Sequence, residues 1–78
     1  MSPEDASTLE SGEGWSRLIL VGDIDIGSVP HLKPLVSTLI AQEPRATLLD
    51  LSKVAFLDSS GLGLIAEVAR ASRTVSGV

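Results

Sequence analysis

Two apolar runs separated by an amphipathic segment constrain the fold of this chain more than any other feature. Residues 18–21 are apolar without interruption, and residues 47–51 form a second, largely apolar run. Such runs are typical of strands that are covered on both faces of a sheet. Between them, apolar residues recur at the spacing of a one-faced helix: Leu32, Leu35, Val36, Leu39 and Ile40. Strand, helix and strand in this order predict a parallel, right-handed βαβ unit.

The start of this first helix is less clearly marked than its end. Pro30 fits the first turn of a helix, whereas Pro34 lacks a backbone donor and predicts either a delayed start or a kink. Glu43 and Pro44 end the helix before the second apolar run begins. The sequence therefore predicts the end of the helix but leaves its start open.

A second helix is predicted directly after the second strand. Residues 54–57 lead into Asp58-Ser59-Ser60-Gly61, after which one apolar stripe follows helical spacing to about Ser72: Leu62, Ile65, Ala66 and Ala69. We expect this stripe to face the sheet, with a second strip of Ser60, Leu64 and Val68 beside it. The predicted core contains Leu20, Leu35, Leu39, Leu49, Ile65 and Ala66.

Size and charge limit the functions that this domain could have. Seventy-eight residues make one small domain, and a hydrophobic content of 44% is too high for a disordered chain. A formal charge of -4 argues against a nucleic-acid or anionic membrane surface, so a protein partner is expected. The chain has no cysteine, which excludes disulfides and thiolate chemistry and agrees with a cytoplasmic location. Residues 1–14 are polar and acidic and are expected to form a mobile tail, leaving residues 15–78 as the domain.

The Asp58–Gly61 segment is the part of the sequence with functional chemistry in prospect. It places two hydroxyl groups and a carboxylate where a strand meets a helix. Helix capping alone would explain Asp and Ser at this position. The alternative is a modification site, because the amides and the dipole at a helix N-terminus accommodate a phosphate well.

Catalytic and cofactor sites have weaker support in the sequence. A serine nucleophile needs a base within reach, and the single histidine, His31, lies between two prolines at the start of the first helix. Asp23 and Asp25 point to one face of an extended segment, but no further ligand is spaced to complete a metal site. We therefore predict no enzyme activity, no metal and no cofactor.

Two blocks of the sequence resemble the signature of STAS domains. Residues 48–63, from Leu48 through Asp58-Ser59-Ser60-Gly61 to Gly63, are similar to the motif around the regulatory serine of that family. Gly22-Asp23-Ile24-Asp25 resembles the Gly-x-x-Asp at the end of an earlier strand of the family. The resemblance spans about Arg17 to Arg73 and implies an α/β fold with helices packed on a parallel or mixed sheet.

The form Asp-Ser-Ser-Gly resembles the anti-sigma-factor antagonist subgroup of this family. That subgroup binds an anti-sigma factor that is also a serine kinase, and so releases a sigma factor until the antagonist is phosphorylated. The resemblance implies that Ser60 is the phosphoacceptor. The residues that it and the strip on the second helix suggest for partner binding are Asp25, Asp58, Ser59, Gly61, Leu64 and Val68.

The C-terminal end departs from the family pattern, which continues with a further strand, helix and strand. This chain ends at Gly77-Val78, where the next strand would begin. A C-terminally shortened STAS domain would leave a strand at a bare edge, which predicts self-association. The alternative function is a STAS adaptor or structural subunit of a sensor or transporter complex that is never phosphorylated.

Overall fold

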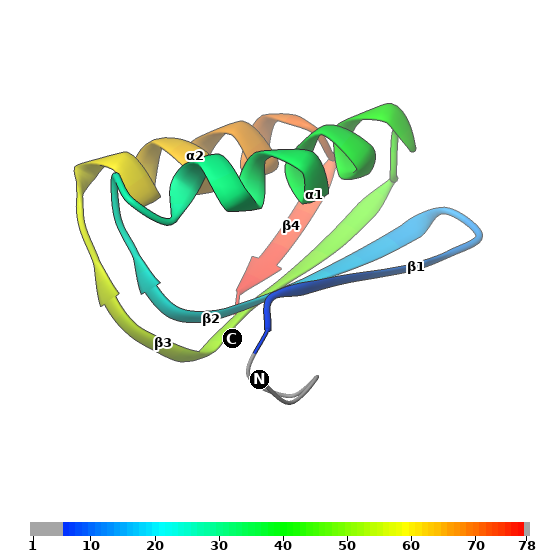
Figure 1. The fold of residues 1–78 in the computed structure, drawn as a ribbon. Helices are drawn as coiled ribbons and strands as arrows, with labels where there is room; N and C mark the ends of the chain where they lie inside the picture. The colour runs from blue at the N-terminus through cyan, green and yellow to red at the C-terminus, as the bar shows by residue number, and fades with distance from the viewer. Residues whose placement is uncertain (1–5, 78) are drawn as a thin grey trace.

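The computed structural model describes residues 6–77, which form a mixed sheet and two helices (Figure 1). The elements in chain order are β1 (Thr8–Gly12), β2 (Trp15–Ile24), α1 (Val29–Ala41), β3 (Ala46–Leu57), α2 (Ser59–Arg70) and β4 (Thr74–Gly77). The sheet order is β1-β2-β3-β4. β1 runs antiparallel to β2, whereas β3 pairs in parallel with both β2 and β4. The predicted α/β class and the parallel βαβ unit are confirmed.

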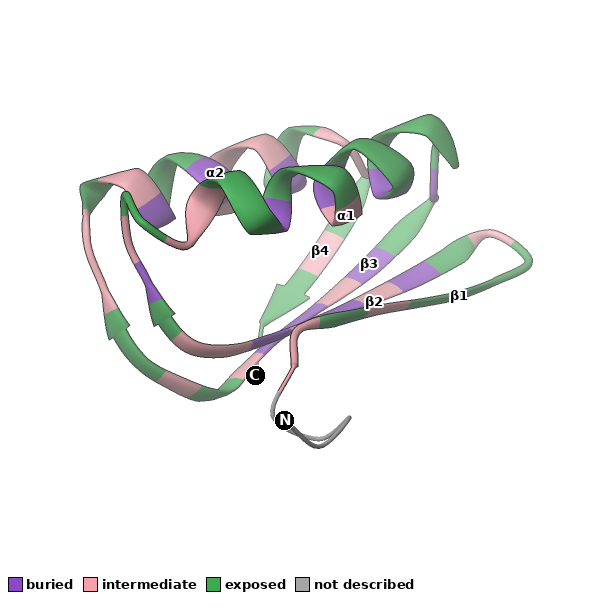
Figure 2. Cartoon of the chain, viewed as in Figure 1, coloured by how far each residue is buried: buried purple, intermediate pink, exposed green. Residues whose placement is uncertain are grey.

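Both helices lie on one face of the sheet, and the core fills the space between the two layers (Figure 1). Apart from Pro44 in the loop before β3, the buried residues of the described chain lie along the sheet-facing sides of the helices and on β2 and β3 (Figure 2). The apolar members of this core are Leu18, Leu20, Ile24, Leu32, Val36, Leu39, Leu49, Leu64 and Val68. The predictions for Leu20, Leu39 and Leu49 are confirmed, while Leu35 and Ile65 are half-buried and pack against the core.

Helix α1 is continuous through Pro34, with Pro30 in its first turn. The missing amide of Pro34 therefore neither delays the start of the helix nor divides it. The amide that Pro34 lacks would have bonded to the carbonyl of Pro30, one turn earlier. The hydroxyl of Thr38 donates to the carbonyl of Pro34 itself at 3.0 Å.

The sheet-facing side of α2 differs from the predicted one. Leu64 and Val68 are buried, whereas Leu62, predicted to face the sheet, is 56% exposed, and Ala66 is half-buried rather than in the core. Both stripes follow helical spacing, so periodicity does not decide between them. The helix exposes Leu62 and Ala69 of the predicted stripe and buries Leu64 and Val68 instead. Because valine has more apolar surface than alanine, this rotation buries more apolar surface than the predicted one.

The prediction of a mobile tail is wrong for residues 8–12, which form strand β1. Leu9 lies opposite Leu18 and packs against the core, although the flanking residues of the strand are polar and exposed. A tight turn joins β1 to β2, and Gly14 adopts a positive φ of 79° there, a conformation that suits glycine. The sequence hides this strand because an edge strand buries few of its side chains. Residues 1–5 of the predicted tail lie outside the described residues.

The prediction that the chain stops where the next strand would begin is also corrected. β4 forms at Thr74–Gly77 and covers the first part of β3, from Ala46 to Leu49. Among the described residues, the part of β3 from 50 to 57 has no neighbour on that side. Self-association through this shorter open edge stays a prediction.

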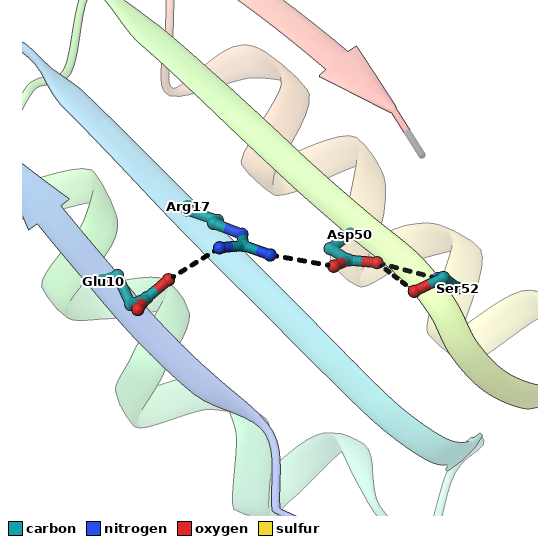
Figure 3. A network of polar contacts seen from close by, with 4 residues as sticks. All are labelled: Glu10, Arg17, Asp50 and Ser52. Atoms are coloured by element: carbon teal, nitrogen blue, oxygen red, sulfur yellow. Dashed lines mark hydrogen bonds and ion pairs between the residues drawn. The ribbon is translucent and has the colours of Figure 1, made fainter. Parts of the chain in front are cut away.

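A row of polar side chains crosses three strands (Figure 3). Arg17 contacts Glu10 on β1 at 3.3 Å and Asp50 on β3 at 3.4 Å. Asp50 accepts hydrogen bonds from the hydroxyl and the backbone amide of Ser52, at 2.6 and 2.9 Å. These bonds and the nearby guanidinium of Arg17 lower the pKa of Asp50, outweighing its desolvation. The row connects β1, β2 and β3 on the face away from the helices.

Candidate functional site

The junction between β3 and α2 is held by Asp58, which is the N-cap of the helix. Its backbone is extended, and its carboxylate accepts a hydrogen bond from the amide of Gly61 at 3.0 Å. Its own amide donates to the carbonyl of Ile24 at 3.2 Å. Asp58 therefore fixes the start of α2 and also connects it to the end of β2. The capping role that the sequence allows for this residue is confirmed.

Gly61 lets the first turn of α2 pack directly against the end of β2. A Cβ atom at this position would overlap the carbonyl oxygen of Ile24 and lie 2.6 Å from a methyl group of Leu57. Gly63, two residues further on, has no atom within 4 Å of such a Cβ. The close approach at Gly61 thus sets the position of the serines that precede it in the same turn.

Ser59 and Ser60 occupy the first two positions of α2. Ser59 is exposed and Ser60 is half-buried. Within residues 6–77, neither hydroxyl and neither backbone amide of the two serines has a hydrogen-bond partner. The first turn therefore presents two hydroxyl groups next to free amides at the positive end of the helix dipole.

Asp25 lies in the loop after β2, at the same end of the sheet. Its Oδ1 atom accepts hydrogen bonds from the amides of Gly27 and Ser28, both at 3.0 Å. Ser28 in turn donates from its hydroxyl to the carbonyl of Asp23 at 2.7 Å. Asp25 thus orders its own loop and is half-buried. The structure brings this predicted residue to the same end of the sheet as Asp58 and Ser60.

Three of the residues predicted to bind a partner are not on the surface. Gly61, Leu64 and Val68 are buried against the sheet, so their side of α2 is unavailable for contact. The exposed large apolar side chains at this end of the sheet are instead Ile26, Phe56 and Leu62, which are 78%, 55% and 56% exposed. Sequence reasoning missed all three. The exposure of Ile26 could have been predicted from the sequence, because Ile26 lies between Asp25 and Gly27 in a predicted loop.

No histidine lies beside the two serine hydroxyls as a hydrogen-bond partner in the described part of the chain. His31 is exposed on α1 and is not hydrogen-bonded to either serine. Among residues 6–77, no three His, Cys, Asp or Glu side chains are grouped to hold a metal ion. Neither helix in this range is long and apolar enough to span a membrane.

Comparison with known protein families places a STAS domain over most of this chain. The model of that family matches residues 9–77, which include β1, both helices and β4. A search of curated protein sequences found no match. The family assignment therefore rests on a match to nearly all of the described fold, including the strand that the sequence did not reveal.

Solved structures with the same fold include anti-sigma factor antagonists. One from Mycobacterium paratuberculosis is 28% identical with a TM-score of 0.80, and the match covers 97% of this chain and 68% of that chain. SpoIIAA, an anti-sigma factor antagonist, is also 28% identical, with a TM-score of 0.65 for its unphosphorylated form. The phosphorylated form of SpoIIAA, a Bacillus cell fate determinant, gives the same two values. Both matches cover 85% of this chain and 62% and 61% of the SpoIIAA chains.

Proposed function

This chain belongs to the STAS domain family, and we propose that it is an anti-sigma factor antagonist controlled by phosphorylation of Ser60. In this proposal the unphosphorylated chain binds an anti-sigma factor that is also a serine kinase, and so frees a sigma factor. Phosphorylation by the bound kinase then weakens the complex. The chain itself is a binding module and substrate, not an enzyme.

The observation that carries the proposal is the pair of unbonded serine hydroxyls at the start of α2. A serine whose hydroxyl capped the helix would have to give up that bond when modified. Here Asp58 supplies the cap, so the hydroxyl of Ser60 is free to accept a phosphoryl group. Ser60 also stands at the family position of the phosphoacceptor, directly before Gly61.

A phosphate at this position should leave the fold intact. It adds about -1.5 to -2 charges, which the free amides and the dipole at the N-terminus of α2 stabilise. The equal TM-scores of the two SpoIIAA forms against this chain agree with a fold that both states share. The effect of phosphorylation therefore falls on the partner, which must desolvate a dianion beside Asp25 and Asp58.

The proposed contact surface combines the serine end of α2 with the exposed apolar residues around it. Ile26, Phe56 and Leu62 supply apolar contact, and Ser59, Ser60 and Asp25 supply the polar part. Leu64 and Val68 do not contact the partner in this proposal; they pack in the core and fix the position of the helix that carries the serines. A surface with apolar residues next to a modifiable hydroxyl suits a protein partner better than a small ligand.

Kinase treatment followed by mass spectrometry tests the proposal directly. The anti-sigma factor kinase is taken from a gene neighbouring that of this chain, and phosphate incorporation is mapped in the parent, Ser60→Ala and Ser59→Ala chains. We expect incorporation in the parent and in Ser59→Ala, and none in Ser60→Ala. Equal labelling of Ser60→Ala would move the phosphoacceptor to another residue.

The same samples distinguish the alternative function, a STAS adaptor that is never phosphorylated, from the proposed antagonist. A chain that binds its partner but takes no phosphate, and whose affinity is unchanged by Ser60→Asp, would be a structural STAS module. Circular dichroism of each variant provides the control, because every variant must retain the helix content of the parent.

A further inference from the structure

Three arginines gather at the end of the sheet opposite Ser60. Arg45 precedes β3, Arg70 ends α2 and Arg73 precedes β4. Together with Glu43, Pro44, Ala71 and Ser72 they line one surface hollow of about 440 Å³. The chain has six Lys and Arg residues in all, so half of its positive charge lies around this hollow although the net charge is -4.

The three guanidinium groups make no ion pair or hydrogen bond within the described residues. Among residues 6–77, the ion pairs involve Arg17 and Lys33 but none of these three arginines. Within the same residues, the side-chain hydrogen bonds donated by arginine all come from Arg17. Each of the three therefore presents a planar set of N–H donors with no acceptor in the described chain.

The side chain of Arg45 packs on the glycine of the turn between β1 and β2. Its guanidinium lies over Gly14, where a Cβ would come within 2.8 Å of its Nη2 atom. Its backbone amide also donates to the carbonyl of Gly14 at 3.0 Å. Gly14 leaves the room for this side chain, so the guanidinium of Arg45 packs on the turn between β1 and β2, while Arg45 also lines the hollow.

From this geometry we propose that the hollow between Arg45, Arg70 and Arg73 binds an oxyanion of the phosphate class. Guanidinium groups recognise phosphate through paired, charge-assisted hydrogen bonds, and three of them exceed the single negative charge of Glu43 at the same hollow. The C-terminal ends of both helices also face this end of the sheet, and their carbonyl dipoles lower the net positive potential. We therefore expect binding to be weak because of these dipoles, and selective for phosphate because of the paired guanidinium hydrogen bonds.

Arg70 ends α2 and lines the hollow, whereas Ser60 lies in the first turn of the same helix, so the hollow and the proposed phosphorylation site are at opposite ends of α2. A helix of 12 residues is roughly 18 Å long. An anion bound at the arginines would leave the serine hydroxyls and Asp58 uncovered. The two proposals can therefore fail separately.

Titration of the full chain with inorganic phosphate, followed by NMR of the backbone amides and the arginine Nε–H groups, tests this site. Ionic strength is kept constant with chloride. We expect saturable shifts at Arg45, Arg70 and Arg73. Each single Arg→Gln change should weaken binding about 2- to 5-fold, which is the range for exposed ion pairs, and the triple change should weaken it more than about 10-fold.

Two controls separate binding from general ionic effects. Lys53→Gln removes a positive charge from β3 outside this hollow and should leave the phosphate affinity unchanged. Arg→Lys at each of the three positions retains the charge without the planar fork and should give an intermediate loss. Shifts that do not saturate, that chloride reproduces, or that persist in the triple variant would overturn the proposal.

A parallel titration with other phosphate ligands identifies the kind of molecule that carries the phosphate group. Free O-phosphoserine and a short phosphoserine peptide are compared with inorganic phosphate on the same chain. Binding of the peptide at least about 10-fold more tightly than of O-phosphoserine would identify a phosphorylated protein as the ligand. Equal binding would identify a small phosphorylated molecule, and failure of all three ligands would overturn the site.

Discussion

The two ends of α2 meet their surroundings in opposite ways. At the serine end, backbone groups determine the geometry: Asp58 caps the helix, and Gly61 packs onto the carbonyl of Ile24. At the arginine end, long exposed side chains surround an open hollow, and no carboxylate of the described residues pairs with them. Substitutions at the first end should therefore change structure, and substitutions at the second should change only charge.

A substitution on the buried side of α2 should give the largest change in the free energy of unfolding. Leu64→Ala removes a buried side chain beneath the serine end and should lower the free energy of unfolding by about 2 to 5 kcal/mol. Leu62→Ala, its matched control on the exposed side, should change it by no more than about 0.5 kcal/mol. Urea unfolding of both variants measures the difference. Equal effects would mean that the helix is rotated relative to the structure described.

The glycines of the first two turns of α2 provide the next test. Gly61→Ala places a methyl group against the backbone of Ile24, which cannot move as a side chain can. We expect a loss of about 1 to 3 kcal/mol in the free energy of unfolding. Gly63→Ala introduces the same methyl group into open space and should instead stabilise the helix, by up to about 1 kcal/mol. Chemical denaturation that ranks the two variants in the reverse order would refute the close approach at Gly61.

Removing the cap should have a smaller effect than either packing change. Asp58→Ala leaves the amide of Gly61 without its acceptor and should destabilise the chain by about 1 kcal/mol. Asp58→Asn retains a capping oxygen and should recover most of the loss. Thermal unfolding of the two variants side by side measures the cap. An alanine variant as stable as the parent would show that Asp58 is free for another role.

The polar row on the other face of the sheet gives the smallest effect, one that depends on pH. The pKa of Asp50 is lower in the folded chain than its unperturbed value of 3.8, so its ionised form stabilises the fold at any pH above that value. This contribution is lost as the pH falls through the lowered pKa. Asp50→Asn should therefore have a lower free energy of unfolding than the parent at pH 7. This difference should shrink as the pH falls through the lowered pKa of Asp50. A pH-independent difference would remove the ionised Asp50 from the account.

Sequence patterns predicted the parts of this fold that depend on strong local signals. The apolar runs of β2 and β3 and the periodicity of α1 predicted the βαβ unit, and capping was one of the two roles that the sequence allowed for Asp58. The sequence did not predict strand β1, because Leu9 is its one large apolar residue and even Leu9 is only half-buried. The sheet-facing side of α2 was wrong because two stripes had equal periodicity, and only packing against the sheet decides between them.

The candidate site was predicted in part for the same reason. Asp25, Asp58, Ser59 and Ser60 lie next to strand or helix ends, where position along the chain fixes position in space. Which apolar residues of α2 lie on the surface depends on the rotation of the helix. Leu62 was therefore predicted to be buried and Leu64 to contact a partner, whereas the structure exposes Leu62 and buries Leu64. The arginine hollow assembles three separate segments of the chain, and no local pattern joins them.

The affinity of the anti-sigma factor kinase for this chain, measured before and after phosphorylation of Ser60, tests the central claim most directly. The chain phosphorylated at Ser60 should bind about 5- to 150-fold more weakly, the range of coupling energies between linked events. The triple Arg→Gln variant serves as the control for general charge effects and should show the same ratio. An affinity that does not change on phosphorylation of Ser60 would contradict the account.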